Sequence, residues 1–518
     1  MAGTGHAVVI GGSVAGICAA RALRDRFGTV TICEQDALPS NGPGRRGTPQ
    51  AWHNHFLLDV GREAIETLFP GFTDLLLANG GSRLDPGFDA ATCCATGWMP
   101  RARTGMSTLF ASRMTVEATL RELLLRDPGI VIRDGVRVDG LVSEVAGSRT
   151  RVTGVTYRDS GSAARGELAA DLVVDAAGRG SPGSKWMRDL GFEVEELTLD
   201  AKVSYSSRWY RLPEEQISWW KWMMVLPEAD PRVAASHQYL CIVFPVEDNR
   251  IIAMMASWGL PAPSDTASFE QLARQTRTKE FARVLDAAEP LTDVHTTRAT
   301  RNIWRRFDRL PAPPAGFIAL GDAVCAFNPI YGQGMSSAAV AGVLVQRIGR
   351  DTDPASPEFP AAFYAEQARF LKRPWTLAMT RDRGYEHAQG TEAIIDGPHK
   401  TMLRRINWPA FQFFAEAVWQ DPVVDSHFNQ VLNLGESLPR FLINPRVLAG
   451  LGLYGARKLL GRTGVPSTVP PHLPPPETDY STLRGAALVD RPGTLRRQPT
   501  TVPASPDRRR ILPRSDRG

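Results

Sequence analysis

The chain has 518 residues, 43% hydrophobic and 22% charged, which is enough for two or three globular domains. No apolar run reaches the roughly 18 residues of a membrane span, so an integral membrane protein is not expected. Residues 464–518 carry nine Arg against five Asp and Glu and supply most of the net charge of +5, so the body gives no sign of nucleic-acid binding. The eleven Pro of this Pro/Arg-rich tail predict disorder.

The cysteine pattern indicates the cellular compartment. The six cysteines show neither CxxC spacing nor an accompanying histidine pattern, and they are Cys18, Cys33, Cys93, Cys94, Cys241 and Cys325. The apolar segment 7–23 lacks the basic lead-in of a signal peptide. We therefore expect reduced thiols, no bound metal and a cytoplasmic protein.

The N-terminal segment HAVVIGGSVAGICAARAL predicts a strand, a glycine turn and a helix. The strand covers Ala7–Ile10, the turn Gly11–Gly16, and the helix runs to about Arg26. A second strand ends on Glu34, 18 residues after the turn. This is the context of a dinucleotide fingerprint, with Ser13 in place of its middle glycine, and it suits a pyrophosphate on the helix N-terminus and a ribose on the acid.

A polar cluster follows in RRGTPQAWHNH, ahead of a helix expected over about 58–69. Its members are Arg45, Arg46, Gln50, His53 and His55. The two histidines are two residues apart, which places them on different faces of a helix, and no third ligand is evident, so a metal site is not expected. Contact with a cofactor and an ordinary surface or capping role both remain open.

Residues 111–127, ASRMTVEATLRELLLRD, predict an amphipathic helix with Arg113 in its first turn. A cation is unfavourable there, so Arg113 is expected to pair with an anion, either a ligand or a protein carboxylate. Residues 130–161 predict a β-meander with glycine turns. DLVVDAAGRGSPG, residues 171–183, predicts a buried strand that ends at Asp175 before a glycine loop.

Tryptophan-rich alternating strands are predicted over residues 197–295. Trp209, Tyr210, Trp219, Trp220 and Trp222 lie within 14 residues of one another. Aromatic walls suit a pocket for an apolar ligand, although the same residues could form the core face of an antiparallel sheet.

The segment GFIALGDAVCAFNPIYGQG, residues 316–334, predicts a strand, an acidic turn and a glycine-rich loop, and a helix follows over 336–347. Such a loop points backbone N–H groups and a helix N-terminus at a ligand, and Asp322 is placed to bind a sugar hydroxyl. A tight strand-to-helix turn is the alternative. Helices are expected from there to about residue 460.

Three glycine and acid elements, at 11–34, 171–183 and 316–334, are interrupted by a β-rich insert. This order predicts an α/β (α+β) fold in which a split Rossmann-like domain is threaded through an antiparallel-sheet substrate domain. The expected divisions are 5–75, 105–196 and 296–375 for the split domain, 76–104 and 197–295 for the β-rich domain, 376–463 for C-terminal helices, and 464–518 for the tail.

From about residue 5 to 460 the chain resembles FAD-dependent monooxygenases of the p-hydroxybenzoate-hydroxylase-like fold, and within them the bacterial polyether-epoxidase and squalene-epoxidase-like branch. The resemblance rests on GGSVAG with Glu34, RRGTPQAWHNH, SRMTVEATLR, DLVVDAAGRGS and GDAVCAFNPIYGQGM. It implies that the split Rossmann-like domain binds FAD.

The resemblance also implies roles for single residues. The FAD pyrophosphate would be held by Gly11, Gly12, Ser13 and Gly16, and the adenosine ribose by Glu34. Arg113 would lie along the pyrophosphate and ribityl chain, with Arg45 or Arg46 beside the flavin. Asp322 would bind the ribityl or pyrophosphate, and the ring would be lined by Pro329, Gly332, Gln333 and Gly334. The expected substrate-pocket residues are Trp209, Trp220, Trp222 and Phe327.

The implied reaction inserts one oxygen atom of O2 through a flavin hydroperoxide, and no catalytic side chain or metal is required. Aromatic hydroxylases of this fold read GDAAH where this chain has Cys325, which favours epoxidation of an apolar polyene or terpenoid secondary metabolite. Electrons would come from NAD(P)H or a separate flavin reductase. Aromatic hydroxylation, FAD-dependent dehydrogenation, halogenation and a non-enzymatic flavin-binding role are the alternatives. The apolar segment 445–460 is expected to be a packed helix, without membrane association.

Overall fold

The computed structural model describes residues 4–38, 45, 47–95, 97–99, 104–147, 149–162, 164–213, 220–228, 235–298, 300–393 and 410–462. The chain divides into two compact units, each built from three separate segments. The first unit comprises 1–81, 111–202 and 299–394, and the second 82–110, 203–298 and 395–518. The expected α/β fold class, with one split unit and a second one built on a large sheet, is confirmed.

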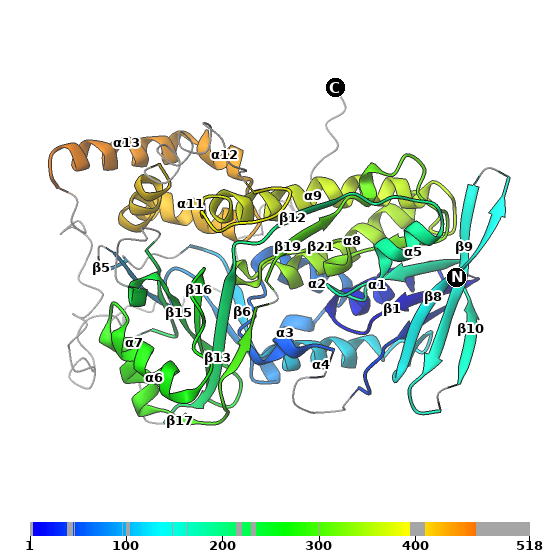
Figure 1. Ribbon diagram of the computed structural model, residues 1–518, viewed down its shortest axis with the longest axis horizontal. Coiled ribbons are helices and arrows are strands. Elements are labelled where there is room, and N and C mark those ends of the chain that lie inside the picture. Colours follow the sequence, from blue (N-terminus) through cyan, green and yellow to red (C-terminus); the bar gives the residue numbers. More distant parts are fainter. Residues whose placement is uncertain are drawn as a thin grey trace, which may run out of the picture. The chain divides into compact units, whose positions relative to one another are not determined.

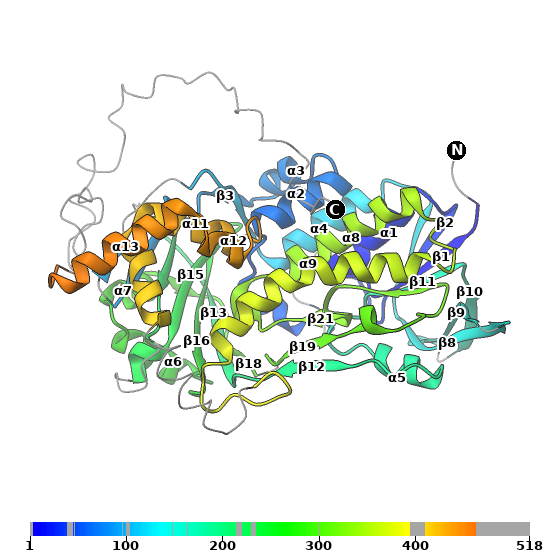
Figure 2. The same ribbon diagram turned by 90° about the horizontal axis from the view of Figure 1, so that it is seen from above.

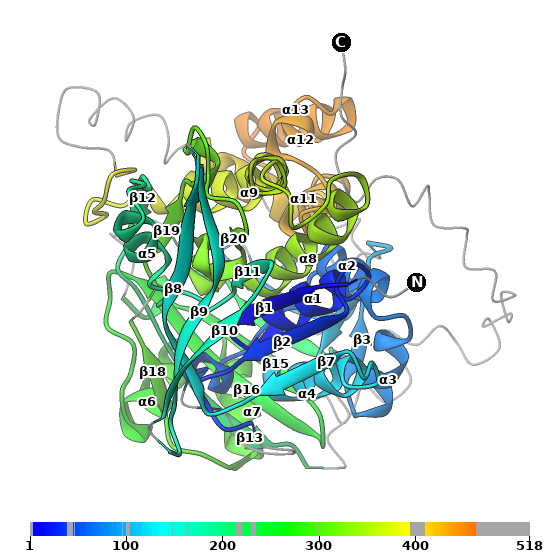
Figure 3. The same cartoon turned by 90° about the vertical axis from the view of Figure 1, so that its right-hand side faces the viewer.

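A five-stranded parallel sheet forms the centre of the first unit (Figure 1, Figure 3). Its order is β20 (Phe317–Ala319), β11 (Leu172–Asp175), β1 (His6–Ile10), β2 (Thr29–Cys33) and β7 (Ile130–Arg133). The inner strands are buried along almost their whole length, which explains why they read as continuous apolar runs.

The expected meander was wrong in its first strand. Residues 130–133 form β7, the edge of the parallel sheet, where Ile130 pairs with Val30 of β2. The remaining strands form a separate antiparallel sheet in the order β10 (Arg165–Ala169), β9 (Arg149–Asp159) and β8 (Val136–Ala146). The partner of β7 is β2, which lies far away along the chain, so the local sequence of β7 does not reveal this pairing.

Helices pack around the parallel sheet, with α8 beside both α1 and α9 (Figure 2). They are α1 (Val14–Leu23), α2 (Asp59–Leu68), α3 (Phe72–Ala78), α4 (Arg113–Leu124), α5 (Gly183–Asp189), α8 (Gly334–Asp351) and α9 (Phe359–Asp382). Small residues bring α8 close to its neighbours. A Cβ atom at Gly342 would lie 2.8 Å from Cys18 Cβ of α1, and one at Gly61 would lie 2.4 Å from Ser336 Oγ.

The described residues also form a small antiparallel sheet and five short 3-10 turns. The sheet has the order β12 (Glu196–Leu199), β19 (Asn302–Arg305) and β21 (Cys325–Ala326). The turns are η1 (Pro49–Trp52), η2 (Ala235–Gln238), η3 (Phe307–Arg309), η4 (Gly321–Ala323) and η5 (Pro329–Tyr331). Because β21 lies between η4 and η5, this sheet anchors the loop that leads from β20 into α8.

The second unit is built on an eight-stranded sheet, antiparallel apart from the β14–β4 pair. Its order is β17 (Glu289–Pro290), β13 (Val203–Arg211), β16 (Arg250–Trp258), β15 (Leu240–Val246), β14 (Trp222–Val225), β4 (Ala90–Cys94) and β5 (Gly97–Trp98), with β18 (His295–Thr297) also on β13. β3 (Ser82–Leu84) pairs with β6 (Thr108–Phe110). Helices α6 (Thr266–Gln275) and α7 (Lys279–Ala287) contribute Phe269 and Phe281 to the core on one face of the large sheet.

The C-terminal helices belong to the second unit. Residues 410–420 are helical, followed by α11 (Pro422–Leu432), α12 (Leu438–Leu442) and α13 (Pro445–Leu459). The expected helical region 376–463 is therefore divided, since α9 ends within the first unit. The tail predicted over 464–518 lies outside the described residues. Among the described helices, none combines the length and apolar character that crossing a bilayer requires.

We predict that Gly342→Ala destabilises the protein, because the new methyl group would press against Cys18 of α1 and Leu68 of α2. We expect a loss of about 1–3 kcal/mol of unfolding free energy, measured as a shift of the urea midpoint by circular dichroism. Gly452→Ala in α13 is the control, since nothing lies within 4 Å of its new Cβ. Equal midpoints for the two variants would contradict the close α1–α8 contact.

Candidate functional site

Four strands of the parallel sheet end at the same level. Ile10 pairs with both Cys33 and Asp175, and Asp175 pairs with Ala319. The residues that follow these ends therefore share one edge of the sheet, and they are Gly11, Glu34, Ala176 and Leu320. Ligands of open α/β sheets bind at the carboxyl ends of the strands, so this edge is the candidate site.

The turn after β1 is shaped by its glycines. Gly11 has φ +103°, and a Cβ there would lie 2.5 Å from the Ala176 carbonyl oxygen. A Cβ at Gly16 would lie 1.8 Å from the Gly11 carbonyl oxygen, so α1 begins directly against the turn. The Gly12 N–H donates to Glu34 Oε2 at 2.8 Å. The predicted residues of this turn are thus brought together by close backbone packing.

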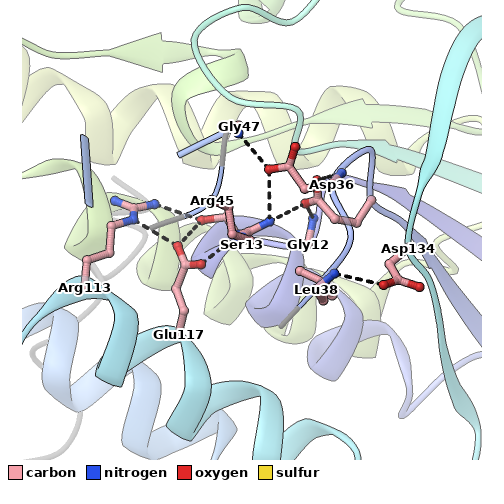
Figure 4. Close-up of polar contacts among 10 residues, drawn as sticks. Gly12, Ser13, Asp36, Leu38, Arg45, Gly47, Arg113, Glu117 and Asp134 are labelled. Atoms are coloured by element: carbon pink, nitrogen blue, oxygen red, sulfur yellow. Dashed lines mark hydrogen bonds and ion pairs between the residues drawn. The ribbon is translucent and has the colours of Figure 1, made fainter. Parts of the chain in front are cut away.

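Ser13 precedes α1 but its hydroxyl does not cap the helix. It donates instead to Glu117 Oε1 of α4 at 2.6 Å and accepts from Arg113 Nη2 at 2.8 Å (Figure 4). Arg113 Nε also donates to Glu117 Oε1 at 2.9 Å. The first turn of α1 contains no acidic residue, so its N-terminal N–H groups and dipole remain available to an anionic ligand.

Arg45 links the ends of two elements that are distant in sequence. Its guanidinium lies 3.0 Å from Glu34 Oε2 and 2.7 Å from Glu117 Oε2, and its side chain is almost fully buried. Glu34 Oε1 accepts in turn from the Asp36 N–H at 2.9 Å. Arg45 therefore sits between two carboxylates at the glycine turn. The second arginine of the predicted pair, Arg46, lies outside the described residues.

Two titratable groups of this cluster have shifted pKa values. Burial alone would raise the pKa of Glu117, but Arg113 and Arg45, with the hydrogen bonds from Ser13 and Arg45, hold it below the ordinary value. Burial and the nearby Arg113 charge lower the pKa of His55 to about 3, so its imidazole is neutral at pH 7. His55 Nε2 lies 2.8 Å from the Gln50 carbonyl oxygen, to which it donates in this neutral form.

The second half of the site is the loop between β20 and α8. Gly321 has φ +61°, and its Cβ would lie 2.8 Å from the Ala15 side chain, so this loop touches the first turn of α1. Asp322 follows, with a Cβ at Gly334 placed 3.6 Å from its Oδ1. Desolvation raises the pKa of the Asp322 carboxyl, and the charges of Arg179, Arg113 and Arg305 oppose that rise.

Gln333, one of the residues expected to line the flavin ring, has an unusual side-chain environment. Its side chain is 1% exposed, and neither Nε2 nor Oε1 has a hydrogen-bond partner within the described part of the chain. Gln333 directly precedes α8, whose first turn contains no acidic residue. Upstream of it, Pro329 begins η5, and Gly332 follows the end of η5 with φ +65°. A buried amide without partners is costly, so this position calls for a ligand with both donor and acceptor groups.

The predicted pocket residues do not form one group. Trp220 joins the core that packs against α6 and α7, in agreement with the sheet-core alternative. Trp209 and Trp222 lie on strands whose alternate residues, Tyr210 and Met223, face that core, so these two tryptophans point to the opposite face. Phe327 belongs to the first unit, where its carbonyl accepts from Arg179 at 2.5 Å.

The sequence analysis did not identify several residues that shape this site. Glu117 was a detectable case, because it interrupts the apolar face of a helix at the position four residues after Arg113. Arg179 and Asp382 carry no comparable local signal. Cys325 is buried, and burial raises its thiol pKa well above the ordinary value, which keeps the thiol protonated at neutral pH. Within the described ranges no group of His, Cys, Asp or Glu could hold a metal ion.

We predict that Glu117→Gln destabilises the protein in a pH-dependent way. Because the folded-state pKa of Glu117 lies below its unfolded value near 4.5, its charge stabilises the fold above that pH. This contribution disappears as the pH falls through the folded-state pKa. We expect a loss of about 3 kcal/mol at pH 7 in urea unfolding, shrinking below pH ~4.5.

Glu122→Gln is the matched control on the same helix, because its ion pair with Arg126 is exposed. Its effect should stay within about 0.5 kcal/mol at all pH values. Parallel pH profiles for wild type and Glu117→Gln would refute the role given to the buried carboxylate.

The chain is similar to known proteins in sequence and in fold. No family model matches it. Protein Rv3254 of Mycobacterium tuberculosis (strain ATCC 25618 / H37Rv) is 31% identical over 453 residues, which cover 84% of this chain and 90% of that protein.

Three solved structures of low sequence identity have the same fold. A flavoprotein/dehydrogenase from Cytophaga hutchinsonii is 15% identical with a TM-score of 0.58, and the flavin-dependent brominase Bmp2 is 14% identical with a TM-score of 0.57. Each match covers 88% of this chain and 99% of the other. A 2-methyl-3-hydroxypyridine-5-carboxylic acid oxygenase is 17% identical with a TM-score of 0.53, over 72% of this chain and 90% of that one. The chain therefore belongs to the family of Protein Rv3254 and has the expected p-hydroxybenzoate-hydroxylase-like fold of flavoprotein oxidoreductases.

Proposed function

We propose that the protein is an FAD-dependent monooxygenase that inserts one oxygen atom of O2 into an apolar small molecule. Epoxidation of a polyene or terpenoid secondary metabolite is the leading reaction, and aromatic hydroxylation is the runner-up. The observation that carries the proposal is the buried, unpartnered amide of Gln333 at the N-terminus of α8.

The Gln333 amide offers one acceptor and two donor hydrogens. The pyrimidine edge of an isoalloxazine ring offers the complementary set of carbonyl oxygens, ring nitrogens and an N–H. FAD would therefore satisfy an amide that the described residues leave unpaired. The N-terminus of α8, with no acid in its first turn, would stabilise negative charge on the reduced ring by roughly 0.3–1 kcal/mol or more.

The other end of the site suits the diphosphate and sugar parts of FAD. The glycine turn before α1 leaves the helix N-terminus open, and Arg113 lies at the same place. Asp322 lies between this turn and α8, because the residue before it contacts Ala15 while its own carboxylate neighbours Gly334. We propose that Asp322 binds the ribityl chain and that Glu34 binds the ribose.

Bound FAD, once reduced, supplies the electrons that activate O2. The protein then has to hold the substrate and exclude water. In the second unit, the sheet face opposite α6 and α7 is aromatic, since Phe110 lies 5.5 Å from Trp222 and 4.7 Å from Phe244 between ring centroids. We propose that this face supplies apolar contacts to the substrate.

The names of the structurally similar proteins support the reaction class without fixing the substrate. They include an oxygenase, a flavin-dependent brominase and a flavoprotein/dehydrogenase. The preference for epoxidation rests on the resemblance of GDAVCAFNPIYGQGM to the epoxidase-like branch. The electron donor is proposed to be NAD(P)H or a flavin reduced by a partner reductase.

The deciding experiment is turnover under 18O2 with panels of polyenes and phenols, followed by mass spectrometry of the products. One 18O atom in a product that equals the polyene plus one oxygen, and that hydrolysis converts to a diol by adding one water, establishes epoxidation, and one 18O in a newly formed hydroxyl group of a phenol establishes hydroxylation. Products that lose two hydrogens and carry no 18O would replace the proposal by dehydrogenation. Supplying either NAD(P)H or chemically reduced free flavin identifies the electron source.

We predict that Gln333→Leu stabilises the flavin-free protein while weakening FAD binding. Removing a buried unpaired amide should raise the unfolding free energy by about 1–3 kcal/mol, and loss of its bonds to FAD should raise the dissociation constant about tenfold. Thermal unfolding and fluorescence titration measure the two effects.

Gln367→Leu is the control, since this equally buried glutamine donates to the Ala319 carbonyl oxygen. It should destabilise the flavin-free protein. If Gln333→Leu lowered stability as well, the amide would have a structural partner and the assignment of Gln333 to FAD would fail.

We predict different consequences for oxygen use from two neighbouring tryptophans. Trp222→Phe should raise the share of consumed O2 that is released as peroxide, because the substrate would be held less well, and it should also lower the unfolding midpoint because the indole is buried against Phe110. Trp220→Phe should lower the unfolding midpoint by opening a gap in the α6–α7 core, at a cost of about 1–3 kcal/mol, without changing that share. Oxygen-electrode and peroxide assays measure the ratio, and equal ratios in both variants would remove Trp222 from the pocket.

A further inference from the structure

We propose that Asp382, the last residue of α9, is a positioning residue that holds the loop carrying Gln333 in its ligand-binding conformation. The geometry of the loop stands on its own, whereas the ligand, FAD, rests on the proposed function. The sequence motifs assign this residue no role.

The Asp382 carboxylate is fully buried, and side-chain donors of Asn302, Asn328 and Tyr331 from the described part of the first unit reach it. Its Oδ1 accepts from Tyr331 Oη at 2.8 Å. Its Oδ2 accepts from Asn302 Nδ2 at 2.9 Å and from Asn328 Nδ2 at 3.3 Å. A carboxylate in such a position is stable only when its lone pairs are matched by donors, and here both oxygens are matched.

The donors fix both ends of one short turn. Asn302 Oδ1 accepts from the Asn328 N–H at 2.7 Å, and Asn328 Oδ1 accepts from the Ile330 N–H at 3.2 Å. Tyr331 ends η5 with its hydroxyl on the carboxylate. The turn from Asn328 to Tyr331 is thus attached to the end of α9 and to the start of β19.

This turn leads directly into the proposed FAD contacts. Gly332 follows Tyr331 in the left-handed region, with its Cβ position 3.1 Å from Phe56 Cβ, and Gln333 comes next. The direction of the Gln333 amide therefore depends on where η5 ends. A loop held in this way can keep two amide atoms unpartnered until a ligand arrives, because the conformational cost is met by bonds outside the ligand site.

The protonation states agree with this hydrogen-bond pattern. Burial, followed by the Asp382 charge, raises the pKa of Tyr331 well above its ordinary value, so the phenol remains a donor. The neighbouring Arg381 stays charged, since Tyr385, Tyr331 and Asp382 outweigh the desolvation that would lower its pKa. The buried negative charge therefore has a cation beside it as well as three donors.

The test compares three variants of the full chain, Asp382→Leu, Asp382→Asn and Tyr331→Phe, with Tyr454→Phe as control. Tyr454 is also buried and donates to a carboxylate, that of Glu416, but it belongs to α13 in the second unit. The two readouts are the FAD dissociation constant from fluorescence titration and the hydrogen-exchange rate of peptide 326–334 in flavin-free protein.

The asparagine variant separates positioning from charge. Its amide oxygen can still accept from Asn302 and Asn328, and its amide nitrogen can donate to the Tyr331 oxygen. We expect D382L to raise the FAD dissociation constant about tenfold or more and to speed hydrogen exchange of the peptide. A tenfold change is the size of effect expected when a buried hydrogen-bond donor loses its acceptor. D382N should stay within about threefold, Y331F should fall between them, and Y454F should match wild type.

Wild-type affinity and exchange in D382L or, if that variant does not fold, in Y331F would overturn the inference. Equal losses in D382N and D382L would also overturn it, since they would show that charge rather than geometry matters. If the wild-type chain bound no FAD, the proposed function would fail, and the exchange rates alone would then decide whether Asp382 holds the loop.

Discussion

A buried carboxylate organises the ligand end of the parallel sheet. Glu117 receives the Ser13 hydroxyl and the guanidinium groups of Arg113 and Arg45, and Arg45 extends the contact to Glu34. Helix α4, the residue after β2 and the segment that carries Arg45 are distant in sequence, and these contacts hold all of them against the glycine turn. Because Ser13 is occupied by Glu117, it leaves the first N–H groups of α1 uncapped, which is the condition for binding an anion there.

The same arrangement recurs at the other half of the site. Asp382 lies behind the β20–α8 loop as Glu117 lies behind the β1–α1 turn, and each belongs to a helix outside the segment that it fixes. In both places a buried acid collects the polar groups that give the backbone its shape. The Gln333 amide, which we propose to face FAD, has no hydrogen-bond partner among the described residues. Such preorganisation reduces the entropy lost on binding.

The local features of the fold and site were predictable from sequence. Apolar runs identified the buried strands, and glycine spacing identified the turn, because a Cβ at Gly11 or Gly16 would overlap the backbone. What local sequence could not show are contacts that depend on distant partners. Glu117 and Asp382 are single acids whose donors lie far along the chain, and β7 pairs with β2 instead of its own neighbour β8.

The tryptophans illustrate a second limit. Trp220 and Trp222 have the same parity, so an unbroken strand would place them on one face. Strand β14 begins only at Trp222, so Trp220 lies outside the strand, and its side chain joins the core. Aromatic composition predicted an apolar environment for both residues, but the start of the strand decided which of them joins the core against α6 and α7.

The segmented layout of the first unit has a consequence for translation. β11 obtains its second neighbour only when Phe317–Ala319 has left the ribosome, long after Leu172–Asp175. Until then the nascent chain carries an unpaired, apolar strand edge while the strands of the second unit emerge. Such an edge can pair wrongly with other chains, so this protein should depend on holding chaperones during synthesis more than a protein of equal length built from contiguous domains.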